Sequence, residues 1–127
     1  MNNILLFAVL IISNYSYSQN TLDNQFEKTR GIFMEHSLIH GDKELFYNKS
    51  ENVLDFGHFI VPLNLVKIEY FFKQEEGQNF VYLRCFDKIP CINDDIIELG
   101  ILFKTKENCY DFINALAELN QMNLNHK

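Results

Sequence analysis

Tryptophan is absent from this 127-residue sequence, and glycine occurs only five times, never at neighbouring positions. Without tryptophan the chain lacks the usual stacking platform for sugars, and isolated glycines do not form the loop that cradles phosphate groups. After residue 18 the only serines are Ser37 and Ser50, and neither lies in a G-x-S-x-G motif. These absences argue against carbohydrate stacking, phosphate binding by a glycine-rich loop and serine-hydrolase catalysis.

Positive charge is scarce as well. The chain carries 11 Lys and Arg against 17 Asp and Glu, which gives a formal net charge of −6 at pH 7. No cluster of basic residues interrupts this acidic character, and the like-charge pairs Glu75–Glu76 and Asp94–Asp95 are typical of solvated turns. Because an acidic surface repels phosphate groups, we expect no nucleic-acid partner and no binding to anionic lipid surfaces.

The longest apolar run lies at the N-terminus. Ile4–Ile12 is uninterrupted by polar residues, and Ser16 and Ser18 stand at the −3 and −1 positions of a cleavage site. This layout predicts a secretory signal peptide over residues 1–18 and a single exported domain over residues 19–127. A helix that spans a bilayer needs about 20 apolar residues, so no transmembrane anchor is expected after cleavage. The domain is therefore predicted to be periplasmic or extracellular.

Apolar residues recur at helical spacing at both ends of the exported part. Near its start a helix is predicted over about residues 21–40, with Gln25 away from the apolar stripe. The residues that define this stripe are Leu22, Phe26, Thr29 and Phe33. Near its end Thr105 is a good N-cap for a second helix that reaches about residue 122. The stripe of this amphipathic helix consists of Cys109, Phe112, Ile113, Leu116, Leu119 and Met122.

Between the two helices the hydrophobic period changes to two, which is typical of β-strands. The clearest alternation covers residues 66–73, and a loop that contains Gly77 predicts a hairpin after it. Pro90 lacks the N–H group that a central strand needs, so residues 89–92 are expected at a sheet edge. Further strands are predicted at residues 44–47, 53–56, 80–86 and 97–104.

An antiparallel meander followed by one amphipathic helix resembles the pleckstrin-homology-like superfold over about residues 44–122. The chain is also similar to small exported bacterial proteins of unknown function, in Val61-Pro62-Leu63 leading into Leu65-Val66-Lys67-Ile68-Glu69-Tyr70 and in a cysteine pair around the middle hairpin. The resemblance implies an α+β domain whose strongly bent antiparallel sheet, a barrel or sandwich, is closed by the C-terminal helix. Lipid-binding members present several basic residues on the first hairpin loop, whereas here Lys49 stands alone beside Glu51. Phosphoinositide binding is therefore not expected.

Three cysteines follow the predicted signal peptide. Cys85 and Cys91 flank a turn centred on Lys88, so equal counting along two antiparallel strands places them opposite each other, within disulfide range. A bond that closes so small a loop is worth about 2 kcal/mol in the chain-entropy model. Three roles are open for this pair: a structural staple, two unpaired thiols or a redox switch. Cys109 is expected to be a buried free thiol, although sequence alone leaves a bridge from Cys109 to the hairpin open.

His36 and His40 are four residues apart, a spacing that puts both on one side of a helix as in a two-histidine metal site. The sequence around them is not H-E-x-x-H, and a third ligand would have to come from Asp42, Glu44 or His58. The alternative is a pair of ordinary histidines at the surface or partly buried. No metal and no cofactor are expected.

Three aromatic side chains are expected on the outward face of the predicted strands. Phe71 takes the polar side of its strand, and Phe80 and Tyr82 do the same if the apolar residues between them point inward. An exposed apolar patch of this kind often marks a partner site. The alternative is that the N-terminal helix covers these rings through Phe26 and Phe33.

The function that follows from these patterns is a small exported non-enzymatic domain that binds a protein or peptide. Its expected surfaces are the outward aromatic face and the sheet edge near Pro90, and no catalytic residues are assigned. A first alternative is a structural or redox-regulated envelope protein governed by a Cys85–Cys91 disulfide. A second is a metal-dependent enzyme that uses His36 and His40.

Overall fold

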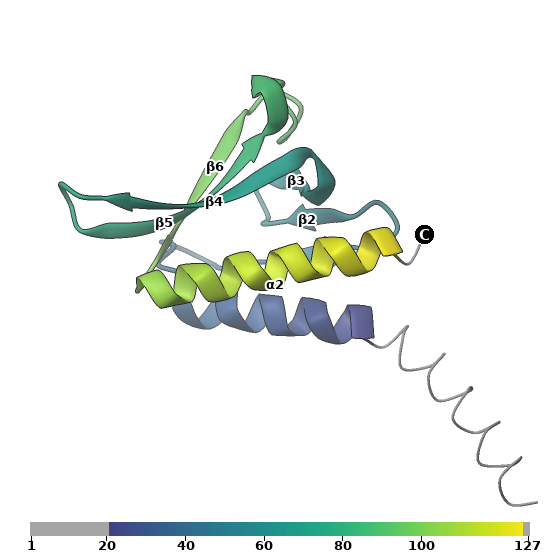
Figure 1. The fold of residues 1–127 in the computed structure, drawn as a ribbon, viewed down its shortest axis with the longest axis horizontal. Coiled ribbons are helices and arrows are strands. Elements are labelled where there is room, and N and C mark those ends of the chain that lie inside the picture. Colours follow the sequence, from purple (N-terminus) through teal and green to yellow (C-terminus); the bar gives the residue numbers. More distant parts are fainter. Residues whose placement is uncertain (1–20, 126–127) are drawn as a thin grey trace, which may run out of the picture.

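A computed structural model of the chain describes residues 21–125, so the predicted signal peptide and the first two residues of the predicted exported domain lie outside the described residues. Within this range, two α-helices, two short 3-10 helices and six strands make an α+β fold with two antiparallel sheets. The helices lie side by side, and both sheets lie on the same side of the helix pair (Figure 1). Neither helix of residues 21–125 is long and apolar enough to cross a bilayer.

The first sheet consists of three short strands in the order β1-β2-β3. Their bounds are Phe46–Asn48 for β1, Val53–Asp55 for β2 and Ile60–Pro62 for β3. The turn between β1 and β2 is held by the side chain of Asn48, whose Oδ1 accepts hydrogen bonds from the backbone N–H groups of Ser50 and Glu51. This polar turn confirms the hairpin predicted there, although β1 begins two residues later than expected.

The second sheet has longer strands in the order β4-β5-β6. Their bounds are Val66–Lys73 for β4, Gln78–Cys85 for β5 and Glu98–Phe103 for β6. The alternation over residues 66–73 is thus confirmed as a strand, and Gly77 adopts φ +62° in the hairpin turn, where glycine has no steric cost. Phe71 pairs with Phe80, and Phe80 pairs in turn with Leu102. This register decides which side chains share a face of the sheet.

The N-terminal helix covers residues 21–36 of the described chain and ends four residues earlier than predicted. It ends because the chain then pairs with the second sheet, where Ser37 forms an antiparallel bridge with Phe103. Lys43 caps the C-terminal end of this helix, because its Nζ donates hydrogen bonds to the carbonyl oxygens of Met34 at 2.9 Å and Ser37 at 2.6 Å.

The C-terminal helix, α2, spans Lys106–Asn125. Its predicted N-cap is confirmed, because Oγ1 of Thr105 accepts a hydrogen bond from the backbone N–H three residues later at 3.1 Å. The ring centroid of Phe112 lies 5.0 Å from that of Phe103 and 6.0 Å from that of Phe33. The apolar stripe of α2 therefore joins the inner face of the second sheet to the N-terminal helix.

Two buried polar side chains connect these elements, and periodicity predicted neither. Gln25, expected away from the apolar stripe, is buried and donates from Nε2 to the carbonyl oxygen of Ala115 at 3.0 Å. Asn123 is also buried, and its Nδ2 donates to the hydroxyl of Tyr47 and to the carbonyl oxygen of Lys49. The side-chain nitrogens of both residues make hydrogen bonds that offset the cost of burial, whereas Oδ1 of Asn123 is buried without a partner among residues 21–125.

The antiparallel α+β architecture with a helix at each end is confirmed, but the expectation of one strongly bent sheet is wrong. The strands form two separate three-stranded sheets, and neither closes into a barrel. The division falls at the short 3-10 helix Leu63–Leu65, which redirects the chain so that β4 pairs with β5 and not with β3.

Candidate functional site

The three aromatic residues predicted on an outward face lie together on the second sheet. Phe71 is directly opposite Phe80, and Tyr82 lies two residues further along β5. The ring centroids of Phe71 and Phe80 lie 5.6 Å and 5.7 Å from that of Tyr82. α2 packs against the opposite face of the sheet, where Phe103 contacts Phe112. We refer to Phe71, Phe80 and Tyr82 as the outer aromatic face.

The N-terminal helix does not cover the outer aromatic face, so this alternative is wrong. Phe26 instead stacks on Tyr47 with a centroid distance of 5.4 Å, and Phe33 lies 5.4 Å from Phe56. Phe71 is 44% exposed and the other two rings are half-buried. The sheet therefore presents a set of aromatic rings to solvent.

Charged side chains beside the outer aromatic face are paired with one another. Arg84 makes ion pairs with Glu69 at 3.3 Å and with Glu98 at 3.1 Å, and Lys67 lies 3.0 Å from Glu69. The guanidinium of Arg84 also lies 4.6 Å from the ring centroid of Tyr82, within cation–π range. Because two cations balance two carboxylates, this face offers apolar contact without net charge.

A glycine on β6 lets Tyr82 lie close to the neighbouring strand. Gly100 pairs with Tyr82, and a Cβ atom at Gly100 would lie only 2.8 Å from Cε1 of that ring. Leu102, two residues along β6, pairs with Phe80. Alternation along the segment that pairs with β6 puts Leu38, which is 44% exposed, on the same side as Leu102. Apolar side chains thus extend the outer aromatic face towards the β6 edge.

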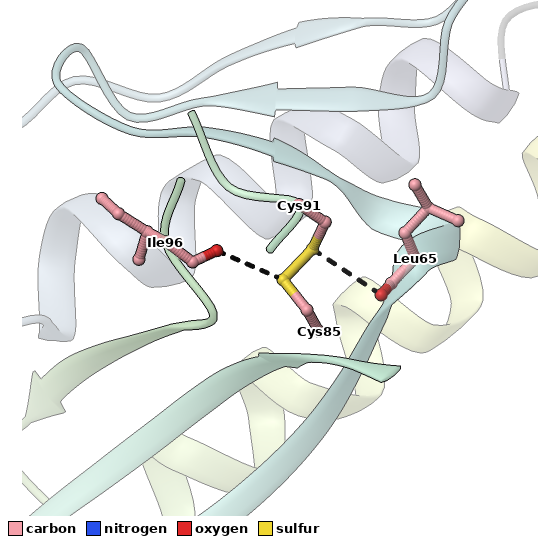
Figure 2. The surroundings of a disulfide bond; sticks show 4 residues. All are labelled: Leu65, Cys85, Cys91 and Ile96. Atoms are coloured by element: carbon pink, nitrogen blue, oxygen red, sulfur yellow. Dashed lines mark hydrogen bonds between the residues drawn. A yellow bond between two sulfur atoms is a disulfide. The ribbon is translucent and has the colours of Figure 1, made fainter. Parts of the chain in front are cut away.

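The predicted disulfide between Cys85 and Cys91 is confirmed, with Cα atoms 5.8 Å apart. The reason for their proximity differs from the prediction, because Cys85 pairs with Val66 in β4 while Cys91 lies in a loop. Figure 2 shows the disulfide between two carbonyl groups. The Sγ atom of Cys85 lies 3.5 Å from the oxygen of Ile96, and the Sγ atom of Cys91 lies 3.8 Å from the oxygen of Leu65. Bonded sulfurs carry no hydrogen, so these are close polar contacts.

The loop that carries Cys91 ties the two sheets together. Ile92 is fully buried, and Oδ1 of Asn93 accepts a hydrogen bond from the backbone N–H of Ile60 in β3 at 2.7 Å. The backbone N–H of Asn93 in turn donates to the carbonyl oxygen of Ile60 at 3.2 Å. Residues 89–92 belong to this loop and not to a strand, so the sheet edge predicted near Pro90 is wrong. These contacts favour a structural role for the bond.

Cys109 is confirmed as a buried free thiol, so it forms no bridge to the hairpin. Burial raises the pKa of this thiol to about 11. The protonated form therefore dominates near neutral pH, and a protonated thiol is a poor nucleophile. Cys109 contributes packing and no reactive group.

The geometric basis of the two-histidine prediction is wrong, because the helix ends at residue 36 and His40 lies in the following loop. His40 lines a cavity together with Asp42, Glu44 and His58. Across residues 21–125, no three or more His, Cys, Asp or Glu side chains are grouped so that they could hold a metal ion.

The cavity itself was not predicted from the sequence. Its volume is about 460 Å³, and its walls come from residue 33 and from residues 39–44, 56–59 and 99–101. Phe33, Phe56 and Ile101 supply apolar surface, which is typical of sites that hold a small molecule or a side chain. Four separate segments between residues 33 and 101 form the walls, so no single sequence motif predicts the cavity.

No protein-family model, curated protein or solved structure matches this chain. Its function is therefore inferred from the outer aromatic face, the β6 edge with its cavity, and the disulfide loop.

Proposed function

We propose that this protein is a small exported non-enzymatic domain that binds a protein or peptide through the outer aromatic face. The observation that carries the proposal is that three aromatic rings lie together on a sheet face that neither helix covers, where Phe71 is 44% exposed. Apolar patches rimmed by polar residues often mark partner sites in proteins of this size. Aromatic rings are also enriched at binding surfaces, because they bury a large area in a defined geometry.

The proposed partner presents apolar groups and not phosphate. Arg84 is already engaged by Glu69 and Glu98, so no free cation cluster accompanies the rings. Lys49, on the first hairpin loop, pairs with Asp23 at 3.3 Å. A phosphate ligand would have to compete with these carboxylates, which supports a protein or peptide partner over nucleic acid or phosphoinositide.

We propose further that the domain is a small pleckstrin-homology-like fold and that residues 1–18 direct its export. Two antiparallel meanders followed by one helix support the first idea. The Cys85–Cys91 bond supports the second, because disulfides persist mainly in oxidising compartments.

The test is partner capture from envelope and secreted fractions of the host that exports the protein. The immobilised wild type is compared with the triple variant Phe71→Ala/Phe80→Ala/Tyr82→Ala and with Phe72→Ala. Phe72 is the matched control, because it is 46% exposed on the adjacent position of β4 and points to the opposite face.

We expect the triple variant to lose most of the captured partner and the Phe72→Ala variant to retain it. Circular dichroism checks that all variants are folded. Unchanged capture by the triple variant would contradict the proposed binding face.

A second candidate function is a structural or redox-regulated envelope protein governed by the Cys85–Cys91 bond. The observation that favours it is the position of the bond, in a loop that reaches β3 through Asn93 and is partly accessible at Cys91. Under this alternative, reduction changes partner capture. Under the binding function, reduction lowers stability and leaves capture unchanged.

A further inference from the structure

β6 is an edge strand, and its backbone groups divide between two sides. The backbone N–H of Cys85 donates to the carbonyl of Ile97 at 2.8 Å, so the groups of Ile97 and of every second residue after it face β5. The N–H and carbonyl groups of Glu98 and Gly100 therefore face away from β5, towards the free edge.

Part of this edge is used within the chain. The N–H of Leu38 donates to the carbonyl of Leu102 at 2.8 Å. The chain then departs from β6 over residues 39–44, and no described strand pairs with the edge beside Glu98 and Gly100. Those two residues present backbone groups that an added strand would satisfy.

The cavity of about 460 Å³ opens beside this free part of the edge, where residues 99–101 form one of its walls. Buried Ile101 faces the core side of the sheet, so the cavity lies on that side and the outer aromatic face lies on the other. Side chains of an added strand alternate between the two faces. Every second side chain would enter the cavity, and those between would lie near Tyr82.

Charges around the cavity favour a basic residue in the occupant. Asp42 and Glu44 line the cavity, and Lys43 is the cation between them. The Nζ of Lys43 already donates to two carbonyl groups at the end of the N-terminal helix, at 2.9 Å and 2.6 Å. His40 and His58 complete the polar lining. Two carboxylates against one ammonium group leave the lining with a net negative charge, which attracts a cation.

We propose that the partner contributes an extended peptide segment that adds to β6 as a further strand beside Glu98 and Gly100. One apolar side chain of the segment fills the cavity, and a Lys or Arg lies close to it. In such strand addition, backbone hydrogen bonds supply affinity and the pocket supplies selectivity. This inference rests on the proposed function, because it specifies how a protein or peptide partner is bound.

The test begins with selection of random peptides of about 12 residues, displayed on phage, on the purified protein. The peptide that binds most tightly is then synthesised with one backbone nitrogen methylated at a time, and each affinity is measured by fluorescence polarisation. Methylation at alternate positions is expected to weaken binding about tenfold, because those N–H groups bond to β6, and the intervening positions are expected to tolerate it. A scan without alternation, or a library that yields no binder, overturns the proposal.

Variants of β6 give an independent measurement. Glu98→Pro removes the N–H that faces the free edge, whereas Glu98→Gln keeps this N–H and removes only the carboxylate that pairs with Arg84. The selected peptide is expected to bind about tenfold more weakly to the Pro variant than to the Gln variant. Equal binding by both contradicts strand addition at this edge. If Glu98→Pro does not fold, the methylation scan on the wild type decides.

The proposed function and this inference fail in different ways. Partner capture that depends on the outer aromatic face, together with a scan without alternation, leaves the function standing and overturns the added strand. Alternation in the methylation scan, together with unchanged capture by the triple alanine variant, supports the added strand and overturns binding through the outer aromatic face. A dimer in sedimentation that Glu98→Pro dissociates would show a second copy at the edge and would overturn the peptide proposal.

Discussion

Removal of the Cys85–Cys91 bond is expected to lower the free energy of unfolding by about 2–3 kcal/mol and to leave the fold intact. The cysteines are six residues apart, so the bond closes a loop of about seven residues in the unfolded chain. The chain-entropy relation gives about 8 cal/mol/K for this loop, or about 2.3 kcal/mol at room temperature. Cys85 is also buried, so replacing it with Ala removes some packing and adds a loss on the order of a few tenths of a kcal/mol.

The assay compares three samples: the oxidised wild type, the reduced wild type and the Cys85→Ala/Cys91→Ala variant. The chain has no tryptophan, so unfolding in urea is followed by the circular dichroism of its two helices. The reduced wild type reports the bond alone, and the variant reports the bond together with the lost packing. Cys109 is unchanged in all three samples and serves as an internal reference for thiol counting.

Two results would refute this reasoning. A loss below about 0.5 kcal/mol would mean that Ile92 and Asn93 hold the loop without help from the bond. A loss above about 5 kcal/mol would mean that the bond maintains the native contacts between the sheets and does more than restrict the unfolded chain. Altered partner capture by the reduced, folded protein would favour the redox-regulated alternative.

Three further outcomes follow from the buried polar groups. Asn123→Ala is expected to lower the free energy of unfolding by about 1–3 kcal/mol, because the carbonyl of Lys49 loses its donor; urea unfolding measures this, with the exposed Asn125→Ala as control. Cys109 is expected to be unreactive towards Ellman's reagent in the native protein at about pH 8 and fully reactive in urea, because it is buried and burial raises its pKa to about 11; rapid native reaction would contradict this. Burial also raises the pKa of Tyr47 to about 12. Both groups bind their protons more tightly in the folded chain, so their contribution to stability is complete below about pH 9 and is lost as the pH rises through about 11 and 12. Urea unfolding midpoints measured across this pH range check the loss of stability. The Cys109→Ala variant is expected to lack the part of the loss that begins at the lower pH.

Local signals in the sequence predicted the strands of the second sheet and the C-terminal helix, but not the division into two sheets. The alternation over residues 66–73 is a reliable signal, because neighbouring strands in register decide which face each side chain takes. Thr105 marks the start of α2, since its hydroxyl satisfies a backbone N–H that the helix leaves free. The position of Phe71 on the outer face follows from the same alternation.

Contacts between distant segments account for what the sequence did not predict. The N-terminal helix ends early because Ser37 pairs with Phe103, a residue that lies far along the chain. Gln25 and Asn123 are buried because each has a hydrogen-bond partner on another element. The cavity beside β6 requires four segments to meet. No periodicity within one segment reports contacts of this kind.

The most direct test of the central claim compares two adjacent positions on β4. A photoreactive benzoylphenylalanine replaces Phe71 in one protein and Phe72 in the other, both produced in the host that exports the chain. The two side chains are similarly exposed, at 44% and 46%, but lie on opposite faces of the sheet. Binding through the outer aromatic face predicts a discrete crosslinked partner from position 71 and none from position 72. Equal crosslinking from both positions, or crosslinking from position 72 alone, would contradict it.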